Sequence, residues 1–584
     1  MAVIVVQETI QHARSTTNSL DITWFDLADA FGSVPHVLIP YVLEHYHFPK
    51  QVIAYVTSLY SKLKGIVCTK KWKSELFKFL KGVFQGDPFS GIIFLTVFNP
   101  LIEYLKTHKE THGYDLKLKD KPATYVVTTP FADDFNVITR DNTQHQNLVS
   151  NVEQKLKTMG LVIKPQKCRS LSIQNGKTVN IQFQIHDNVG NPVKIASVIE
   201  KPLKFLGSEV TADNTPNAMF AFICSKLKEK LKNIGNSSLR AEYKLNIFSR
   251  YTLPSMRYYL SVHQLHKTHM NDLDDIVRKN IKSWLNIQTR GVSDVALYHP
   301  YMLGTKLPSQ MYTEAHAGTY AMIRVKGDPL VNHALDSKLE RESAWTRKHS
   351  TVSNMQQMWN KNLKENKVDK PSQDITHIEK RKQLIKGKKA MKNSIKEETL
   401  NIWNTKVKKL TFQGKFVDLV IEEQENITWK SILNNTPKGI LSFAMKASVN
   451  GLNTPDNLKR WGKRQLDKCG ICGNRSDLEH ILNWCPVALK QGRMTWRHDS
   501  IISHMTKTIK KSKPSDIDIY SDLPGHKMNG GTIPPDILAT SSRPDVVIVD
   551  RSSKEIHLLE LTCSFEKNIE TAHILKSRRY NDLK

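Results

Sequence analysis

Runs of β-branched and aromatic residues alternate with turn signals in the first third of the chain. The segments 123–129 (ATYVVTT) and 135–139 (FNVIT) predict two strands on either side of a tight turn. The run DITWFD, residues 21–26, predicts a further strand. Between residues 148 and 159 apolar side chains recur at helical spacing, and Gly160 supplies the stop. These patterns predict an α+β region.

The pattern beyond the first third becomes helical. One apolar stripe at helical spacing comprises Leu273, Ile276, Val277, Ile281, Trp284 and Leu285. Arg278, Lys279 and Lys282 lie off this stripe and predict a basic helix face. Farther along, eleven basic side chains lie between Lys380 and Lys409, with two glutamates. That run predicts either a segment that binds phosphate groups or a solvated helical linker.

Length and charge narrow the possible functions. A chain of 584 residues is too long for one core, so several domains are expected. The net charge of +29 favours a polyanionic partner, with nucleic acid the usual one, over a basic protein without such a partner. Seven cysteines are too few for a disulfide framework, which predicts a reducing, intracellular compartment. The apolar run at 91–98 stops at Asn99–Pro100 and is too short to span a membrane, and no targeting signal is visible.

Asp133 and Asp134 lie side by side at the predicted hairpin turn. Adjacent carboxylates repel each other unless a cation lies in front of them, and Mg²⁺ prefers such oxygen ligands. Because Mg²⁺ takes only a few protein ligands, a third carboxylate must come from elsewhere, and Asp26 at the end of its strand supplies it. The loop 85–88 (QGDP) precedes a helical apolar segment, an arrangement suited to contact with a nucleotide or template.

The order of these stretches resembles a known family. FDLADAFGSVPH around Asp26, then QGDP, then the FADD that contains Asp133 resemble motifs A, B and C of reverse transcriptases, in the wording of non-LTR retrotransposons. GLVIKPQKCRSLSI resembles motif D, and KPLKFLGSEV resembles the primer grip of motif E. The resemblance implies a right-hand polymerase palm, an antiparallel sheet with packed helices, followed by a helical thumb.

The resemblance also implies roles for individual residues. Asp26 and Asp133 would hold two Mg²⁺ ions with support from Asp134, since the motif register selects Asp26 over its neighbour Asp29. Lys167 matches the motif D lysine, a candidate general acid, although it is equally readable as an exposed lysine. The residues expected to contact nucleotide, template or primer are Phe31 as steric gate, Gln85, Gly86, Phe205, Leu206 and Gly207.

A second motif lies near residue 470. Cys469, Cys472, His480 and Cys485 have the spacing and ligand types of a closed tetrahedral Zn²⁺ site. The alternative is a set of free thiols. Spacing and flanking sequence resemble the zinc knuckle that follows the polymerase in retrotransposons with a restriction-like endonuclease. A structural and nucleic-acid-binding role is expected.

The C-terminal segment 543–566 reads as two strands about a turn, with Asp545 on the first strand and Glu560 on the second. Two carboxylates on neighbouring strands can hold a divalent ion that activates water. The pattern resembles a restriction-like nuclease motif, but Thr562 stands where that motif has lysine. The retrotransposon version moves the lysine to the next helix, where Lys576 matches. The alternative is a surface hairpin with acidic residues.

Taken together, these motifs predict an α+β chain with a polymerase palm, mostly missing fingers, a zinc knuckle and a partial α/β restriction-like nuclease. The expected function is RNA-directed DNA polymerase in target-primed reverse transcription, with a linked endonuclease that nicks DNA. Element RNA, target DNA primer and deoxynucleotides are the expected partners, and the nucleus is the expected place of action. The alternative is an idle, truncated relic that only binds nucleic acid. The expected domains are palm, thumb, basic linker, zinc knuckle and nuclease, at residues 1–210, 211–340, 341–460, 461–500 and 501–584.

Overall fold

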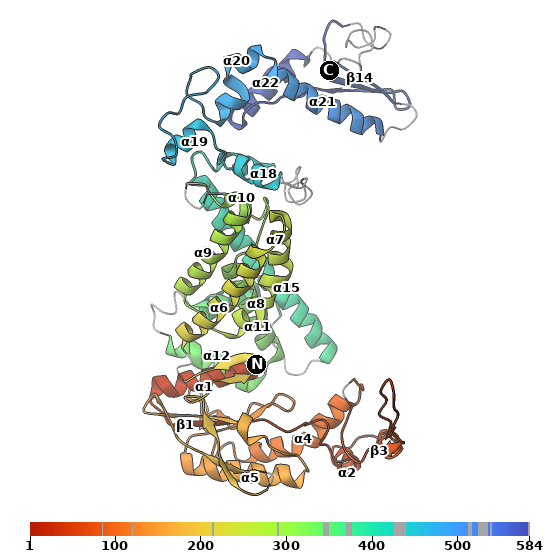
Figure 1. Ribbon diagram of the computed structural model, residues 1–584, viewed down its shortest axis with the longest axis vertical. Helices are drawn as coiled ribbons and strands as arrows, with labels where there is room; N and C mark the ends of the chain where they lie inside the picture. Colours follow the sequence, from red (N-terminus) through yellow and green to blue (C-terminus); the bar gives the residue numbers. More distant parts are fainter. Residues whose placement is uncertain are drawn as a thin grey trace. The chain divides into compact units, whose positions relative to one another are not determined.

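The computed structural model divides into two compact units (Figure 1), each of which draws on several stretches of the chain. The first comprises Met1–Lys232, Tyr251–Asp274 and Pro308–Lys396, and the second comprises the intervening and remaining residues. The two compact units have different boundaries from the five predicted domains and do not test them. The division into five domains therefore stays a prediction. The structure describes all residues except 85, 120, 188, 213–214, 289–290, 343–349, 370–375, 424–435, 437–439, 512–516, 524–534, 536, 538–539 and 582–584.

A mixed sheet lies at the centre of the first unit, with strand order β11-β7-β1-β6 and β8 paired to β7. β6 and β7 flank β1 in antiparallel register, whereas β11 runs parallel to β7. The predicted strand at 21–26 and the strand at 135–139 are thereby confirmed. The strands of the sheet are β1 (Leu20–Phe25), β6 (Phe135–Thr139), β7 (Arg169–Gln174), β8 (Lys177–Val179) and β11 (Ala196–Ser197).

Helices cover both faces of this sheet. Because side chains alternate along each strand, neighbouring residues of one strand pack into different cores. Ile22 and Trp24 of β1 pack in one core with α1 (Ala2–Thr16), while Phe25 and Phe135 pack in another with α4 (Ser90–Thr107) and α5 (Asn142–Thr158). Figure 1 shows α1 on one side of β1 and α5 on the other. The predicted helix before Gly160 is α5, whose first turn is capped by Asp141 accepting from the Gln144 N–H.

The predicted strand at 123–129 is mostly irregular, and only β5 (Tyr125–Val126) is a regular strand, paired with β4 (Tyr114–Asp115). The reason lies in the side chain of Asn136, whose amide replaces ladder hydrogen bonds by bonding the backbone N–H and the hydroxyl of Thr129, both at 2.8 Å. Short strand pairs complete the unit: β2 (Lys64–Gly65) with β3 (Phe77–Lys78), β9 (Gln184–His186) with β10 (Pro192–Lys194), and β12 (Leu203–Phe205) with β13 (Ser208–Val210).

The remaining helices of the first unit lie in two groups along the chain. α2 (Leu38–His45) and α3 (Lys50–Ser61) precede the β2–β3 pair. The later group is α8 (Leu253–Val262), α11 (Pro308–Lys326), α12 (Pro329–Arg341) and α14 (Thr351–Lys364). Three long helices contribute residues to both units: α6 (Pro216–Asn236), α9 (Lys267–Trp284) and α15 (His377–Lys408).

α9 confirms the predicted apolar stripe but corrects the predicted basic face. Lys282 is buried and donates to the Val292 carbonyl at 2.7 Å, and burial lowers its pKa. Arg278 pairs with Asp275 and Asp294 at 2.9 and 3.1 Å. The carbonyl and carboxylate partners, which helical periodicity does not reveal, draw these cations away from solvent. The basic run at 380–409 forms α15, and Met391 and Ile395 are buried, so this helix is only partly solvated.

The second unit contains short helices, the cysteine-rich segment and a three-stranded antiparallel sheet of order β14-β15-β16. The predicted strands after residue 543 are β15 and β16. In chain order its helices are α7 (Ala241–Ile247), α10 (Val295–Tyr298), α16 (Lys415–Glu422), α18 (Leu441–Ala447), α19 (Pro455–Arg460), α20 (Pro486–Lys490), α21 (Arg493–Lys511) and α22 (Ile569–Arg579). Its strands are β14 (Ile517–Ser521), β15 (Val546–Asp550) and β16 (Glu555–Leu559).

Candidate active sites and metal centre

The antiparallel register of β1 and β6 brings the predicted polymerase carboxylates to the same end of these two neighbouring strands. The last register pair is Phe25 opposite Phe135, so Asp26 follows one strand just where Asp134 precedes the other. Burial raises the pKa of the Asp134 carboxyl, and the nearby charges of Asp133 and Asp26 raise it further. The structure therefore places Asp26 beside the turn that carries Asp133 and Asp134, although 107 residues separate Asp26 from Asp133 (133 − 26 = 107).

The turn that carries Asp133 is a tight hairpin. The Phe131 N–H donates to the Asp134 carbonyl at 2.8 Å, and the Asp134 N–H donates back to the Phe131 carbonyl at 3.1 Å. Ala132 has a positive φ of 55°, a conformation that a small side chain tolerates better than a branched one. This geometry holds Asp133 at the tip, half-buried beside its neighbour.

Lys167 lies at the same edge. It ends a 3₁₀ turn, Pro165–Lys167, and its Nζ lies 3.8 Å from Asp26 Oδ2. Two backbone hydrogen bonds tie this segment to the end of β1: the Lys164 N–H donates to the Asp26 carbonyl and the Ala28 N–H to the Val162 carbonyl, at 2.8 and 2.7 Å. The ammonium is 62% exposed, so both sequence interpretations, site residue and solvated lysine, fit its position.

Phe31 and Gly86 belong to two loops near the start of α4. The Phe31 ring stacks on Phe94 of α4 with centroids 4.4 Å apart, and its carbonyl accepts from the Val83 N–H at 2.8 Å. Gly86 is exposed with φ of +98°, and a Cβ there would meet nothing within 4 Å. Gln85 lies outside the described residues.

The predicted primer-grip residues form the turn between β12 and β13. Leu206 and Gly207 have φ of 47° and 78°, and the Leu206 carbonyl accepts from the Tyr258 hydroxyl. The Phe205 ring is 3% exposed and packs against Trp24. Any contact of Phe205 with nucleic acid would thus be indirect, through the turn it supports.

Two other aspartates near these motifs, Asp29 and Asp87, make local contacts. A Cβ on Gly32 would lie within 2.1 Å of Asp29 Oδ2, so the Asp29 carboxylate folds over its own turn. Asp87 accepts from the Phe89 N–H at 3.1 Å and lies 3.3 Å from the hydroxyls of Ser90 and Tyr60. Asp87 therefore orders the start of α4.

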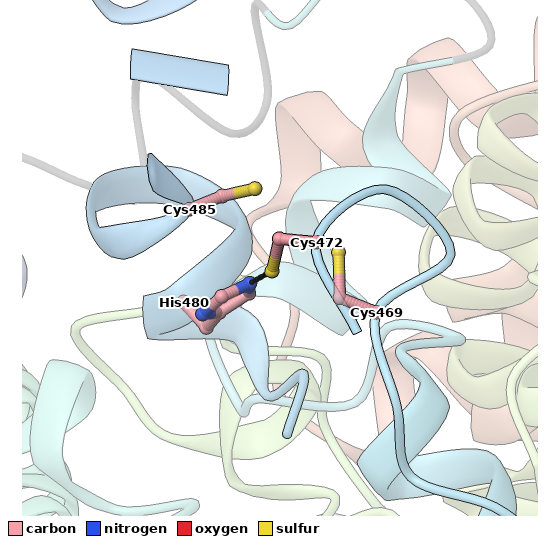
Figure 2. A group of neighbouring side chains, drawn as sticks. All are labelled: Cys469, Cys472, His480 and Cys485. Carbon is pink, nitrogen blue, oxygen red and sulfur yellow. Dashed lines mark hydrogen bonds between the residues drawn. The ribbon is translucent and has the colours of Figure 1, made fainter. Parts of the chain in front are cut away.

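Figure 2 shows that the side chains of the four cysteine and histidine residues point toward a common space. One ligand atom of each of Cys469, Cys472, His480 and Cys485 lies within 4.8 Å of the others. Tetrahedral Zn²⁺ with thiolate bonds of about 2.3 Å places sulfur atoms roughly 3.8 Å apart, so this set fits zinc after a small contraction. Burial raises the pKa of the Cys469 thiol, but backbone N–H groups of Cys472 and Ile471 outweigh it and lower the pKa to about 6. Such a thiol is readily available as thiolate.

The predicted nuclease residues also converge. The Asp545 N–H donates to Glu560 Oε2 at 3.0 Å, and the Leu561 N–H donates to Asp545 Oδ2 at 2.7 Å. Lys576 of α22 contacts Glu560 Oε1. The ammonium therefore reaches the carboxylates from the following helix, as expected from Thr562 at the usual lysine position.

Two further side chains lie at this site: Tyr580, which follows Lys576 in the motif order that the resemblance implies, and His498, which the sequence reasoning missed. His498 of α21 places Nε2 3.3 Å from Asp545 Oδ2 and Nδ1 3.1 Å from Asp499 Oδ1. Tyr580 donates to the Arg543 carbonyl at 3.0 Å, and burial, then the charge of Glu560, raises its pKa to about 12. The sequence carries no local signal for His498, because its partner Asp545 is distant along the chain.

Among the described helices, none combines the length and apolar character needed to cross a membrane.

Comparisons with known proteins bear on the first of these sites. Residues 4–210 match the family model "Reverse transcriptase (RNA-dependent DNA polymerase)". A retrovirus-related Pol polyprotein from a type-1 retrotransposable element R2 of Nasonia vitripennis is 25% identical over 281 residues, covering 48% of this chain and 26% of the relative. A counterpart from the type-2 element R2DM of Drosophila melanogaster is 23% identical over 287 residues, with the same coverage of 48% and 26%.

The chain thus spans about a quarter of the length of these two relatives. Among solved structures, a telomerase from Candida tropicalis in complex with a telomeric RNA fragment aligns with a TM-score of 0.27 and 14% identity, covering 68% of this chain and 52% of that one. That likeness is too weak to bear on the fold. Residues 4–210 thus match the reverse transcriptase family, and about half of the chain is similar to Pol polyproteins of R2 retrotransposable elements.

Proposed function

We propose that this chain is an RNA-directed DNA polymerase whose Mg²⁺ ligands are Asp26, Asp133 and Asp134. The observation that carries the proposal is the meeting of Asp26 with the Asp133–Asp134 turn at one sheet edge, inside the segment that matches the reverse transcriptase model. Three carboxylates with one mostly exposed ammonium make a site of net negative charge, which suits divalent cations.

When bound, two Mg²⁺ ions would activate the primer 3′-hydroxyl and neutralise the triphosphate of the incoming deoxynucleotide. Asp26 and Asp133 would orient that pair from opposite strands, while Asp134, with its raised pKa, would support them. Lys167 is close enough to Asp26 to reach the leaving pyrophosphate and donate a proton to it.

Phe31 and the loop before α4 would select the nucleotide. Stacking on Phe94 keeps the Phe31 ring in one orientation, from which it would exclude a 2′-hydroxyl. The open backbone at Gly86 would allow close approach of nucleotide or template, next to Gln85. The Leu206–Gly207 turn would hold the primer strand.

We further propose that Asp545, Glu560 and Lys576 form a nuclease centre that nicks target DNA and exposes the primer. Asp545 directly before β15 and Glu560 directly after β16, with Lys576 of α22 in contact with Glu560, support phosphodiester hydrolysis assisted by a divalent ion. Cys469, Cys472, His480 and Cys485 would hold a structural Zn²⁺. The template would be element RNA, and the reaction on chromosomal DNA would take place in the nucleus.

Separate substitution of Asp26 and of Asp29 tests the polymerase proposal. The measurement is primer extension on an RNA template with deoxynucleotides and Mg²⁺. We expect Asp26→Asn to reduce extension at least about 100-fold, since even groups one step removed from a bound metal cost 10–100-fold. The matched control, Asp29→Asn, removes a carboxylate three positions away that faces its own turn and is expected to keep extension close to wild type.

Equal losses in both variants would contradict the assignment of Asp26. A wild-type chain that binds the primer–template but extends nothing would favour the alternative of a protein that only binds nucleic acid.

A further inference from the structure

The β2–β3 hairpin carries a concentration of positive charge that the proposed reaction does not use. Residues 62–81 contain seven lysines and one glutamate. All seven lysine side chains are exposed, and within the part of the chain that the structure describes none forms an ion pair. In Figure 1, β3 lies beyond α2 at the far end of the domain from β1. A group of unneutralised ammonium ions on one hairpin attracts a polyanion.

An aromatic side chain stands in the middle of these charges. Trp72 follows Lys70 and Lys71 at the hairpin tip and precedes Lys73, and 59% of its surface is exposed. Five other large apolar side chains between residues 62 and 81 are exposed as well, and an exposed group of this kind marks an interaction surface. Alternation of lysines with an accessible ring is typical of surfaces that bind single-stranded nucleic acid, where bases stack and phosphates are neutralised.

The tip is held in one conformation rather than left loose. The Thr69 N–H donates to the Trp72 carbonyl at 2.8 Å, and the Thr69 hydroxyl accepts from the Trp72 and Lys71 N–H groups at 3.0 and 3.3 Å. Behind the tip, the Ser74 N–H donates to the Val67 carbonyl, and the Ser74 hydroxyl accepts from the Val67 N–H, both at 2.9 Å. An ordered turn presents its ring without having to be ordered on binding.

We propose that this hairpin is a single-strand clamp, in which a base stacks on Trp72 while Lys70, Lys71 and Lys73 neutralise the adjacent phosphates. An unpaired base is required because a duplex keeps its bases stacked on each other. A second copy of the chain fits poorly, because it would bring the same seven lysines against these. The inference rests on the proposed function only for the identity of the strand as the RNA template.

Fluorescence anisotropy with a labelled single-stranded RNA, in the absence of nucleotides, tests the clamp. We expect Trp72→Ala to weaken binding about 30-fold, the central value for loss of one stacked base, and Trp72→Phe to restore most of it. The matched control is Leu76→Ala, which removes an exposed apolar side chain, 68% exposed, from the same hairpin and is expected to leave binding unchanged.

Three further readouts separate stacking from other contacts. Replacing Lys70, Lys71 and Lys73 by alanine should reduce the slope of log affinity against log salt by about 2, at roughly 0.7 per phosphate contact on single strands. Ultraviolet crosslinking of thiouridine-substituted RNA should place a crosslink on the peptide that contains Trp72. Repeating the anisotropy measurement with single-stranded DNA distinguishes a clamp specific for the RNA template from one that holds either strand. The affinity for duplex RNA should not depend on Trp72.

Equal affinities of the Trp72→Ala and Leu76→Ala variants, or a crosslink found only elsewhere, would overturn the proposal. So would a change of sedimentation in Trp72→Ala with unchanged RNA affinity, which would assign the ring to a protein contact. Because Asp26→Asn should bind RNA like wild type while losing extension, failure of the clamp and failure of the polymerase assignment give different results.

Discussion

The proposed polymerase and nuclease sites both place carboxylates at strand ends, yet they balance charge differently. In the first, burial and the charges of Asp133 and Asp26 raise the pKa of Asp134, and Lys167, the one ammonium paired with these carboxylates among the described residues, lies 3.8 Å from Asp26 and is mostly exposed. In the second, Glu560 is already in contact with Lys576, and Asp545 accepts from a backbone N–H and faces His498. The first site is arranged to attract cations, and the second to hold its carboxylates in place. Extension should consequently reach half its maximal rate at lower Mg²⁺ than nicking does.

Removal of zinc should produce the largest difference between the two regions. Structural zinc contributes about 10 kcal/mol or more to folding of small zinc domains. The helical turn that carries His480 (His480–Trp484) and its preceding residue Glu479 contact the proposed nuclease region: Asn483 donates to the Cys563 carbonyl at 3.2 Å, and Lys567 pairs with Glu479 at 2.5 Å. We expect Cys472→Ser to lose zinc, measured by metal analysis, and to lose nicking of plasmid DNA, while extension of a pre-annealed primer persists.

Cys68→Ser serves as the control for that experiment, because Cys68 is an exposed cysteine outside the cluster. It should retain zinc and both activities. Zinc retained by the Cys472→Ser chain would argue against the four-residue site, and loss of extension together with nicking would show that the two regions are not independent.

The two lysines give the next largest effect. Lys576 contacts Glu560 directly, and we expect Lys576→Met to lower the nicking rate about 1,000-fold, the upper range for removal of one charged or polar donor at a reacting phosphate or carbonyl group. Lys167 is exposed, where water can replace it as a proton donor, so Lys167→Met should lower the extension rate by no more than about 100-fold.

Rates of nicking and of single-nucleotide extension, measured on each variant, test this ranking, with Asp545→Asn as the reference for complete loss of nicking. A loss of extension in Lys167→Met as deep as that of Asp26→Asn would show that the exposed ammonium is as essential as the carboxylates. A Lys576→Met chain that nicks at the wild-type rate would remove the lysine from the nuclease centre.

The sequence predicted those parts of the sites that ordered motifs encode. Asp26 and Asp133 were predicted to meet because motif order implies neighbouring strands, and β-pairing in register places them at one edge. His498 could not be predicted, because the contact between α21 and Asp545 depends on tertiary packing alone. Lys282 was placed wrongly on a basic face. Helical periodicity shows on which side of the helix a residue lies, but it does not show that the Val292 carbonyl lies there as an acceptor.

The smallest expected effect is a loss of stability in acid, and it concerns the unit that contains the proposed polymerase site. His145 on α5 is fully buried between the hydroxyls of Thr23 and Thr139, at 2.8 and 2.9 Å from its two ring nitrogens, and burial lowers its pKa to about 3. The unfolded chain, with a histidine pKa of about 6.5, therefore binds a proton that the folded domain rejects. Stability is complete above pH 6.5 and falls as the pH drops toward 3, by about 1.4 kcal/mol between pH 7.5 and 5.5 from this side chain.

His145→Gln should remove that share of the acid sensitivity, although the loss of its buried hydrogen bonds lowers stability at both pH values. The exposed His45, substituted in the same way, should leave the pH dependence unchanged. Urea unfolding followed by pulse labelling of the buried Cys168 thiol, located by mass spectrometry, reports on this domain alone. If the urea midpoint of His145→Gln shifts with pH as much as that of wild type, the acid sensitivity resides elsewhere, first in His263 and His316, whose pKa values burial lowers to about 4.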